Sequence, residues 1–491
     1  MTSVSPLRLY NTLAKREEVF QPAHNKEVSM YTCGPTVYGR PHIGNYSSFL
    51  MADLLRRWLE VSGYTVKHVK NITDVGHLVA DADTGEDKVE KEARRIAEEK
   101  RGKGAVVAMA DVLAVAEMYT RQYLEDELSL HILEPTARPR ASEYVAQMIV
   151  IIQELLAKGH AYETDDGIYF DVQTFTEYGK LSGNTLDQLN AGARVSVDEE
   201  KKHPADFALW KKCVGHNAQH VLRWTSPWGE GFPGWHIECS AMSRTILGEQ
   251  IDLHTGGADN IFPHHECETA QSEASSGKKP FVRMWVHRRR VDIGDQKMSK
   301  SLGNVLSISD IIEKGFSPLD LRYYLLSVHY RTNLKFSWKG MEDTMKARRK
   351  IMDWMGEMEK DGKEGNDGKD SKEDAQNWSA KFADAMNADL NVSEALAVIF
   401  DCMSWSRNVS GFSANDRQGL LMFIDEVRRT FGCFDPEEVF AIPADIQALV
   451  DARAAARASK DFAESDRLRD EISKKGFEVK DTGEGQKVRK M

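Results

Sequence analysis

Residues 41–45 form the first segment whose side chains suit a chemical role. They have the sequence Pro-His-Ile-Gly-Asn and lie between a predicted strand and a predicted helix. The free N–H groups and the dipole at such a helix start favour phosphate. His42 can donate a hydrogen bond to a phosphate oxygen, and Gly44 allows a nucleotide ring to approach the backbone. Alone this segment does not establish a phosphate site, because a histidine before a helix also serves as a cap or a core residue.

Residues 297–304 form a second segment of this kind. They have the sequence Lys-Met-Ser-Lys-Ser-Leu-Gly-Asn and follow a predicted hairpin at 293–296. The ammonium groups of Lys297 and Lys300 and two nearby hydroxyls can surround a triphosphate. Their charge-assisted hydrogen bonds would strengthen as charge builds on a leaving pyrophosphate. An exposed basic loop with no ligand is the alternative.

Several cysteine, histidine and glutamate residues offer the ligand atoms that zinc prefers. His264 and Glu268 are four residues apart, so one face of a helix would present both. Cys267 could compete for that face. Cys33 and Cys239 are far apart in the sequence, so spacing alone does not establish zinc. Two buried cysteines and a polar helix start remain the alternative.

The two nucleotide-binding segments, in this order, resemble the paired signatures of class I aminoacyl-tRNA synthetases. Five stretches extend the resemblance to the cysteinyl-tRNA synthetase family over nearly the whole chain: residues 31–38, 71–74, 235–242, 256–266 and 297–304. The resemblance implies an enzyme that uses ATP to convert L-cysteine to cysteinyl-adenylate and pyrophosphate, and then transfers cysteine to the 3′ end of tRNA(Cys).

The resemblance also implies roles for individual residues. It implies one Zn²⁺ per chain, held by Cys33, Cys239, His264 and Glu268, and Mg²⁺ is expected on the triphosphate of ATP. The residues placed in catalysis are His42, Asn45, Lys297 and Lys300; those around ATP are Gly44, His254, Gly256, Gly257, Asp259 and Lys300; those around cysteine are Gly34, Thr73 and Trp235. For Thr73 and Trp235, a turn cap and a core aromatic remain alternatives.

A zinc ion would explain how the pocket distinguishes cysteine from serine. The two amino acids differ by one atom, which is too little for a purely steric pocket. Zinc binds a thiolate better than a neutral hydroxyl and lowers the thiol pKa, so no editing domain is expected. The α-carboxylate of cysteine would then attack the α-phosphorus of ATP in line, mainly under positioning and electrostatic control.

Two features depart from the family pattern. Asn45 stands where the family motif usually ends in histidine, and we expect its amide to donate to phosphate instead. Residues 457–470 resemble the family's anticodon-binding domain, but the tryptophan that often follows is absent. Lys487 and Arg489 could still hold phosphates there.

The order of predicted elements favours an α/β fold. Strands at 28–32 and 65–69 flank a helix that ends near Gly63, which is a βαβ unit with a parallel sheet. We expect a Rossmann-type parallel-sheet catalytic domain split by an insertion, then a helical bundle and a small, helical C-terminal anticodon-binding-like domain. The expected boundaries are 1–140 and 226–305 for the two catalytic halves, 141–225 for the connective insertion, 306–345 for a stem-contact region, 346–438 for the bundle and 439–491 for the C-terminal domain. Residues 361–376 are predicted to be an exposed, mobile loop.

Composition limits the classes of protein that fit. The chain has 65 Lys+Arg against 76 Asp+Glu, a net charge of −11, which excludes a generally basic nucleic-acid binder. A tRNA must therefore meet local patches such as residues 288–290 and 346–350. Six cysteines do not make a disulfide scaffold in this length. No signal peptide or membrane-length apolar run is evident, so we expect a cytoplasmic protein, and the resemblance implies a monomer.

Two other functions share parts of this pattern. One is a ligase that joins cysteine to an amino-sugar conjugate through the same adenylate, which should lack the C-terminal module. The other is a zinc-stabilised RNA-binding protein without catalysis. Charging of tRNA separates the first from a synthetase, and cysteine-dependent pyrophosphate exchange excludes the second.

Overall fold

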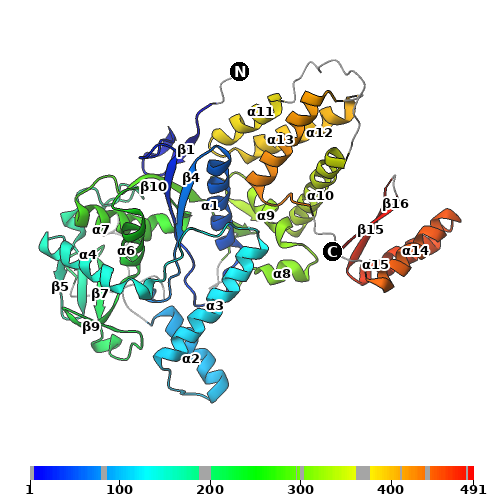
Figure 1. Ribbon diagram of the computed structural model, residues 1–491. Helices are drawn as coiled ribbons and strands as arrows, with labels where there is room; N and C mark the ends of the chain where they lie inside the picture. The colour runs from blue at the N-terminus through cyan, green and yellow to red at the C-terminus, as the bar shows by residue number, and fades with distance from the viewer. Residues whose placement is uncertain are drawn as a thin grey trace.

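The computed structural model describes residues 5–78, 86–186, 201–294, 296–298, 303–360, 376–409, 412–436, 443–482 and 485–490 (Figure 1). Lys300 lies outside this part of the chain, and so does the side chain of Lys297. The predicted mobile loop at 361–376 also lies outside it, apart from residue 376. Within it, no helix combines the length and the apolar character needed to cross a membrane.

A parallel sheet forms the centre of the region that is predicted to be the catalytic domain. In the described part of the chain it contains β3 (Glu27–Thr32), β4 (Thr65–Lys70), β10 (Ile251–Gly257) and β11 (Val282–Arg288). The strand order is β11-β10-β3-β4, so β3 and β10 are neighbours although they are far apart in the sequence. This pairing confirms the predicted parallel sheet and brings the two halves of the catalytic region together.

Helices cover both faces of this sheet. Helix α1 (Ile43–Val61) packs on β4 and β10 from one side, whereas α6 (Trp235–Leu247) packs on β3 and β4, with α7 (Glu266–Ser276) beside it (Figure 1). The apolar side chains Leu50, Leu54 and Trp58 recur at helical spacing and are buried. The helix ends before Gly63, whose φ of +85° suits glycine.

The predicted insertion contains an antiparallel sheet. Its strands, in the order β5-β6-β7-β9-β8, are β5 (Ala161–Glu163), β6 (Gly167–Phe170), β7 (Phe207–Lys212), β8 (Trp224–Ser226) and β9 (Gly229–Pro233). Helix α4 (Val145–Ala157) precedes them and packs on α6 and α7. Strand β9 continues this sheet past residue 225 and leads directly into α6.

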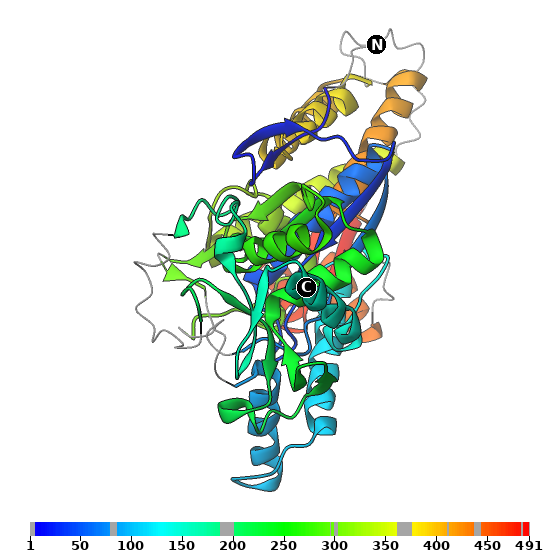
Figure 2. The same ribbon diagram turned by 90° about the vertical axis from the view of Figure 1, so that its left-hand side faces the viewer.

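Other elements surround this centre. Helices α2 (Lys88–Arg101) and α3 (Met109–Ser129) pack together as an arm that projects from the body (Figure 2). The helices between residues 297–304, here called the lysine loop, and the C-terminal domain are α8 (Ile308–Glu313), α9 (Pro318–Leu326), α10 (Trp338–Lys360), α11 (Gln376–Asn387), α12 (Val392–Asn408) and α13 (Ala414–Phe431) in the described part of the chain. Short elements are β1 (Arg8–Asn11), β2 (Arg16–Val19), β12 (Val291–Ile293), β13 (Gln296–Lys297), β14 (Leu334–Phe336), η2 (Ala141–Glu143), η3 (Val172–Thr174) and η4 (Gly215–Asn217).

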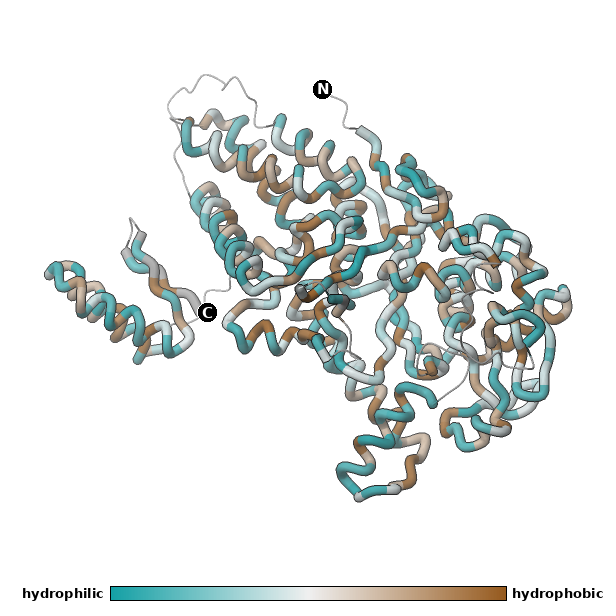
Figure 3. Tube along the Cα trace, turned by 180° about the vertical axis from the view of Figure 1, so that it is seen from behind, coloured by the Kyte–Doolittle hydropathy of each residue, from teal (hydrophilic) through white to brown (hydrophobic). Residues whose placement is uncertain are grey.

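The C-terminal domain has its own small core. Helices α14 (Ala444–Ala458) and α15 (Phe462–Lys474) are followed by a hairpin of β15 (Phe477–Thr482) and β16 (Gly485–Lys490), which corrects the helical expectation. Ile446, Val450 and Ile472 pack with residues of β15 in a cluster separate from the main core. The domain lies apart from the main body (Figure 3), and an ion pair of 2.8 Å joins Arg349 on α10 to Glu478.

A buried arginine connects the catalytic region to the helical region. Arg322 of α9 lies 2.5 Å from the carboxylate of Asp53 on α1, and it donates to the carbonyls of Leu130 and Phe431. Burial raises the pKa of Asp53, but the charges of Arg322 and Arg57 outweigh it and hold that pKa well below its usual range. Removal of Arg322 would leave the buried carboxylate of Asp53 with Arg57 as its remaining charged partner among the described residues.

We therefore expect Arg322→Met to lower the free energy of unfolding by about 3–5 kcal/mol, since an uncompensated buried charge is costly. Chemical denaturation followed by circular dichroism measures this change. Arg429→Met is the control, because Arg429 is exposed and only 3.7 Å from Asp425, a surface pair worth about 0–1 kcal/mol. Equal effects of the two substitutions would contradict the proposed connection.

Candidate active site

A cleft of about 360 Å³ opens at the carboxyl ends of the parallel strands. Cys33 follows β3, Asn71 follows β4, and Gly257 and Arg288 end β10 and β11. Ligands of open α/β sheets bind at this edge. The predicted site residues that line the cleft are Cys33, Gly34, His42, Gly44, Asn45, Thr73, Trp235, Cys239, Gly256, Gly257, Asp259 and His264.

The start of α1 forms one wall of the cleft. His42 is the residue before the helix, and its backbone N–H donates to Oδ1 of Asn45 at 3.1 Å. The Asn45 amide therefore caps the helix through its oxygen, and its NH₂ group is left to serve as a donor. A Cβ on Gly44 would lie 2.9 Å from the His42 ring, so glycine is needed to let that imidazole pack over the helix start.

The side chain of Asn71 fixes the wall that was predicted to contact cysteine. The N–H of Gly34 donates to Asn71 Oδ1 at 2.8 Å, and Asn71 Nδ2 donates to Thr73 Oγ1 at 3.0 Å. A Cβ on Gly34 would lie 1.7 Å from the Asn71 carbonyl oxygen, which excludes any other residue there. Asn71 thus organises this wall. Its place in the 71–74 segment was a signal for this role, although no role was assigned to it.

Four buried side chains converge at the floor of the cleft. The ligand atoms of Cys33, Cys239, His264 and Glu268 all lie within 4.8 Å of one another. The two Sγ atoms are 3.9 Å apart, and Glu268 Oε1 lies 3.7 Å from Cys33 Sγ and 3.0 Å from His264 Nε2. A tetrahedral zinc with Zn–S bonds of about 2.3 Å needs sulfur atoms about 3.8 Å apart. The four residues therefore fit a single metal ion.

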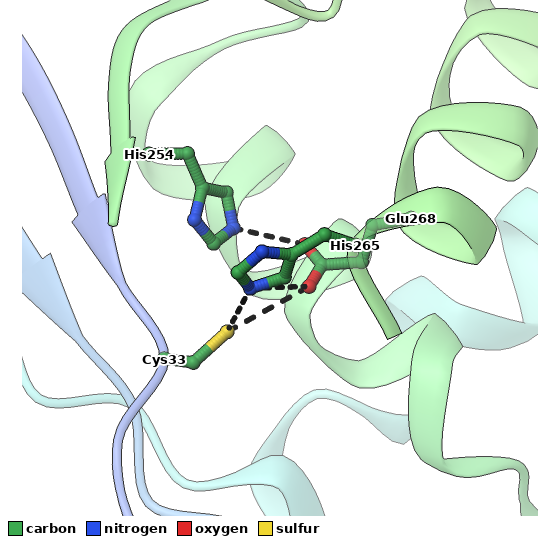
Figure 4. A group of neighbouring side chains, drawn as sticks. All are labelled: Cys33, His254, His265 and Glu268. Atoms are coloured by element: carbon green, nitrogen blue, oxygen red, sulfur yellow. Dashed lines mark hydrogen bonds and ion pairs between the residues drawn. The ribbon is translucent and has the colours of Figure 1, made fainter. Parts of the chain in front are cut away.

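A second set of residues shares two members with the first. Cys33, His254, His265 and Glu268 also lie within 4.8 Å, and Figure 4 shows how they converge. In this set His254 Nε2 is 3.1 Å from Glu268 Oε2, and His265 Nδ1 is 2.7 Å from Nε2 of His287.

The position of the two sets relative to the cleft separates their roles. Cys239 and His264 of the first set line the cleft, whereas His254 and His265 are fully buried behind it. A metal held by the first set would therefore face a ligand in the cleft. His254 then binds the other oxygen of Glu268, as partners of metal ligands commonly do. It lies in that position rather than beside the expected adenosine.

Charges within the first set favour a cation. Burial opposes charge on all of these groups, but the Cys33 hydrogen bond and the charge of His264 bring the pKa of Cys239 to about 6. Burial likewise lowers the pKa of His264, yet Glu268 and Cys239 outweigh it and raise that pKa to about 10. The pKa of Glu268 falls to about 2, because His254 and His264 outweigh burial. At neutral pH the anionic side chains of Cys239 and Glu268 would thus share the single imidazolium of His264. A divalent cation at this point would compensate both negative charges.

The remaining predicted residues are spread around the cleft. Gly256 is packed against His265, since a Cβ there would lie 2.6 Å from the His265 ring. Met298 of the lysine loop lines the cleft beside the start of α1. Cys267 is buried 3.4 Å from the Tyr178 hydroxyl and belongs to neither of the two ligand sets found among the described residues.

The basic patches proposed for tRNA are only partly at the surface. Arg288 is 2% exposed and donates to Ser47 Oγ and to the carbonyls of Leu325 and His329, and burial lowers its pKa to about 10. Arg348 is buried and paired with Asp320 at 3.0 Å. These two arginines therefore have structural contacts that a run of basic residues does not reveal.

Comparison with known proteins places the chain in a family. Residues 19–346 match the family described as tRNA synthetases class I (C) catalytic domain, and residues 441–489 match the cysteinyl-tRNA ligase anticodon binding domain. In fold it is similar to the methionyl-tRNA synthetase of Mycobacterium tuberculosis in complex with methionyl-adenylate. The TM-score is 0.55 at 14% identity, with 83% of this chain and 90% of that chain covered. It is also similar to the LeuRS of an Agrobacterium radiobacter ternary complex, with a TM-score of 0.59, 11% identity and coverage of 84% and 85%.

The fold and the matched catalytic domain define a class I tRNA synthetase. The similarity at the sequence level is more specific. The cysteine–tRNA ligase of Chlorobaculum tepidum is 40% identical over 98% of both chains. That of Thermus thermophilus is also 40% identical, over 98% of this chain and 99% of the relative. The chain belongs to the cysteine–tRNA ligase family.

The geometry predicts which substitutions remove a bound metal. We expect Cys239→Ser and His264→Ala to bind about tenfold less metal than the unmodified chain, because each removes a ligand of the set that faces the cleft. Metal content after dialysis, measured by atomic emission, tests this. Cys267→Ser is the matched control and should retain the metal. Loss of metal in His265→Gln together with its retention in Cys239→Ser would favour the second set instead.

Proposed function

We propose that this chain activates L-cysteine with ATP to cysteinyl-adenylate and pyrophosphate, and transfers cysteine to the 3′ end of tRNA(Cys). The observation that carries the proposal is the single cleft that joins a metal-ligand cluster to the start of α1. The C-terminal match to an anticodon-binding domain supports tRNA as the acceptor and argues against an amino-sugar acceptor. The cytoplasmic location, the monomeric state and the six domain boundaries stay predictions.

The residues of the cleft divide into two neighbouring parts. The start of α1, with His42 and Asn45, offers N–H donors and a helix dipole to the phosphates of ATP and its Mg²⁺. Gly257 and Asp259 lie on the side proposed for adenosine. Lys297 and Lys300 are proposed to hold the pyrophosphate as negative charge develops on it.

The other part of the cleft would hold cysteine. Gly34, Thr73 and Trp235 line it next to the metal-ligand cluster. Zn²⁺ bound by Cys33, Cys239, His264 and Glu268 would supply a Lewis acid that prefers a thiolate to a hydroxyl. The protein walls then direct the carboxylate of cysteine toward the α-phosphate, and this positioning contributes to the rate of adenylation.

The first test is ATP–pyrophosphate exchange with cysteine and with serine, before and after chelation of the metal. We expect kcat/KM for serine to be at least about 100-fold lower, because the site would be built around the thiol. Chelation should remove the activity with cysteine, and readdition of Zn²⁺ should restore it. Equal exchange with serine, or full activity in metal-free protein, would contradict the zinc role. Lys300→Ala should abolish exchange and thereby connect it to the lysine loop.

The second test concerns Asn45. Asn45→Asp keeps an oxygen that accepts from the His42 N–H but replaces the amide donor with a negative charge. We expect melting temperatures close to that of the unmodified chain and adenylation slowed about 100-fold, since a carboxylate repels phosphate. Asn45→Ala should lose both the cap and the donor. Unchanged adenylation in Asn45→Ala would show that this residue does not act on ATP.

A further inference from the structure

Trp235 stacks with two histidine rings in the cleft. Its ring lies 3.9 Å from the His77 ring at an interplanar angle of 10°, and 4.4 Å from the His264 ring at 25°. All three residues line the cleft, and His264 belongs to the metal-ligand cluster. The place of Trp235 relative to this cluster thus depends on the ring of His77.

Two hydrogen bonds hold the His77 ring in place. Its Nε2 lies 2.6 Å from Nζ of Lys88, and its Nδ1 lies 2.7 Å from Oγ1 of Thr36. An ammonium group can only donate, so Nε2 accepts and Nδ1 carries the proton that is donated to Thr36. The ring is therefore held at both nitrogens. His77 is 8% exposed, which leaves the ring little room to turn.

The residues that hold His77 are themselves anchored. Lys88 is the first residue of α2, and Oδ1 of Asp87 accepts from the N–H groups of Val89 and Glu90 at this helix start. The carboxylate of Glu90 in turn accepts from the N–H of Val221 at 3.0 Å. The support of His77 thus reaches the arm and the insertion, which lie beyond the cleft.

We propose that His77 is a positioning residue that holds Trp235 at the distance from His264 needed to close the side of the cysteine pocket. Thr36 and Lys88 fix the ring, and the ring fixes Trp235 by stacking. This role rests on the proposed function, because it takes Trp235 as a wall of the pocket for cysteine. It predicts an effect on cysteine that ATP does not share.

Pyrophosphate exchange on the full chain tests the role of the ring. His77→Asn removes the ring but keeps a polar group near Thr36, and we expect it to raise KM for cysteine about three- to tenfold, the worth of one aromatic stack. KM for ATP should change by less than about twofold, and the metal content should be unchanged. His77→Phe keeps a ring in the stack and should restore most of the affinity for cysteine.

The matched control is His160→Asn. The His160 ring stacks with Phe170 at 6.3 Å and 6°, its Nδ1 lies 2.9 Å from Oγ1 of Thr174, and the residue is outside the set that lines the cleft. Its loss should leave both KM values unchanged. An unchanged KM for cysteine in His77→Asn would overturn the proposal, and so would an equal rise in both KM values.

Two further outcomes keep the test decisive. If His77→Asn does not fold, Lys88→Met replaces it in the test. This substitution retains the stacked ring but removes one of its hydrogen bonds. An unchanged KM for cysteine in Lys88→Met then overturns the proposal. If the unmodified chain shows no cysteine-dependent exchange, the proposed function fails, whereas normal exchange with insensitive variants contradicts only the role of His77.

Discussion

The burial of two thiols and a carboxylate at one point is the constraint on which the rest of the structure depends. Cys33, Cys239 and Glu268 are all removed from water, and the imidazole of His264 is the one cation that the four-residue cluster can itself form. Burying like charges together is unfavourable unless a cation compensates them. A metal ion would resolve this conflict, and the position of the cluster at the floor of the cleft would place that ion against a ligand bound there.

The fold serves to bring these groups together. Cys33 follows β3, Cys239 lies in α6, and His264 and Glu268 lie where η6 (Ile261–His265) passes into α7. Strands β3 and β10 pair in parallel, with Leu253 opposite Met30 and Thr255 opposite Thr32. This pairing brings Cys33, which follows β3, next to the segment after β10 that carries the other ligands His264 and Glu268. The antiparallel sheet of the insertion contributes as well, because β9 leads directly into α6 and so positions Cys239.

Sequence reasoning predicted local elements such as α1 and the parallel sheet, but not the contacts between distant segments, and the metal ligands stay a prediction. The apolar spacing in α1 and the Gly63 stop were enough to place that helix, and the metal ligands followed from the resemblance. The stack of His77 on Trp235 joins residues far apart in the chain, and a lone histidine after a turn carries no signal for it. Likewise, the carbonyls around Arg288 come from a segment about forty residues later. The C-terminal hairpin was missed because its alternation, with Phe477 and Val479 buried, is short.

The central claim is that the metal contacts the sulfur of the substrate, so that chemistry rather than shape selects cysteine. X-ray absorption at the zinc edge measures this directly by counting the sulfur neighbours of the ion. The account predicts two sulfur neighbours in the zinc-loaded protein, from Cys33 and Cys239, three after addition of L-cysteine, and two after addition of L-serine. Two sulfur neighbours in the presence of saturating cysteine would contradict it.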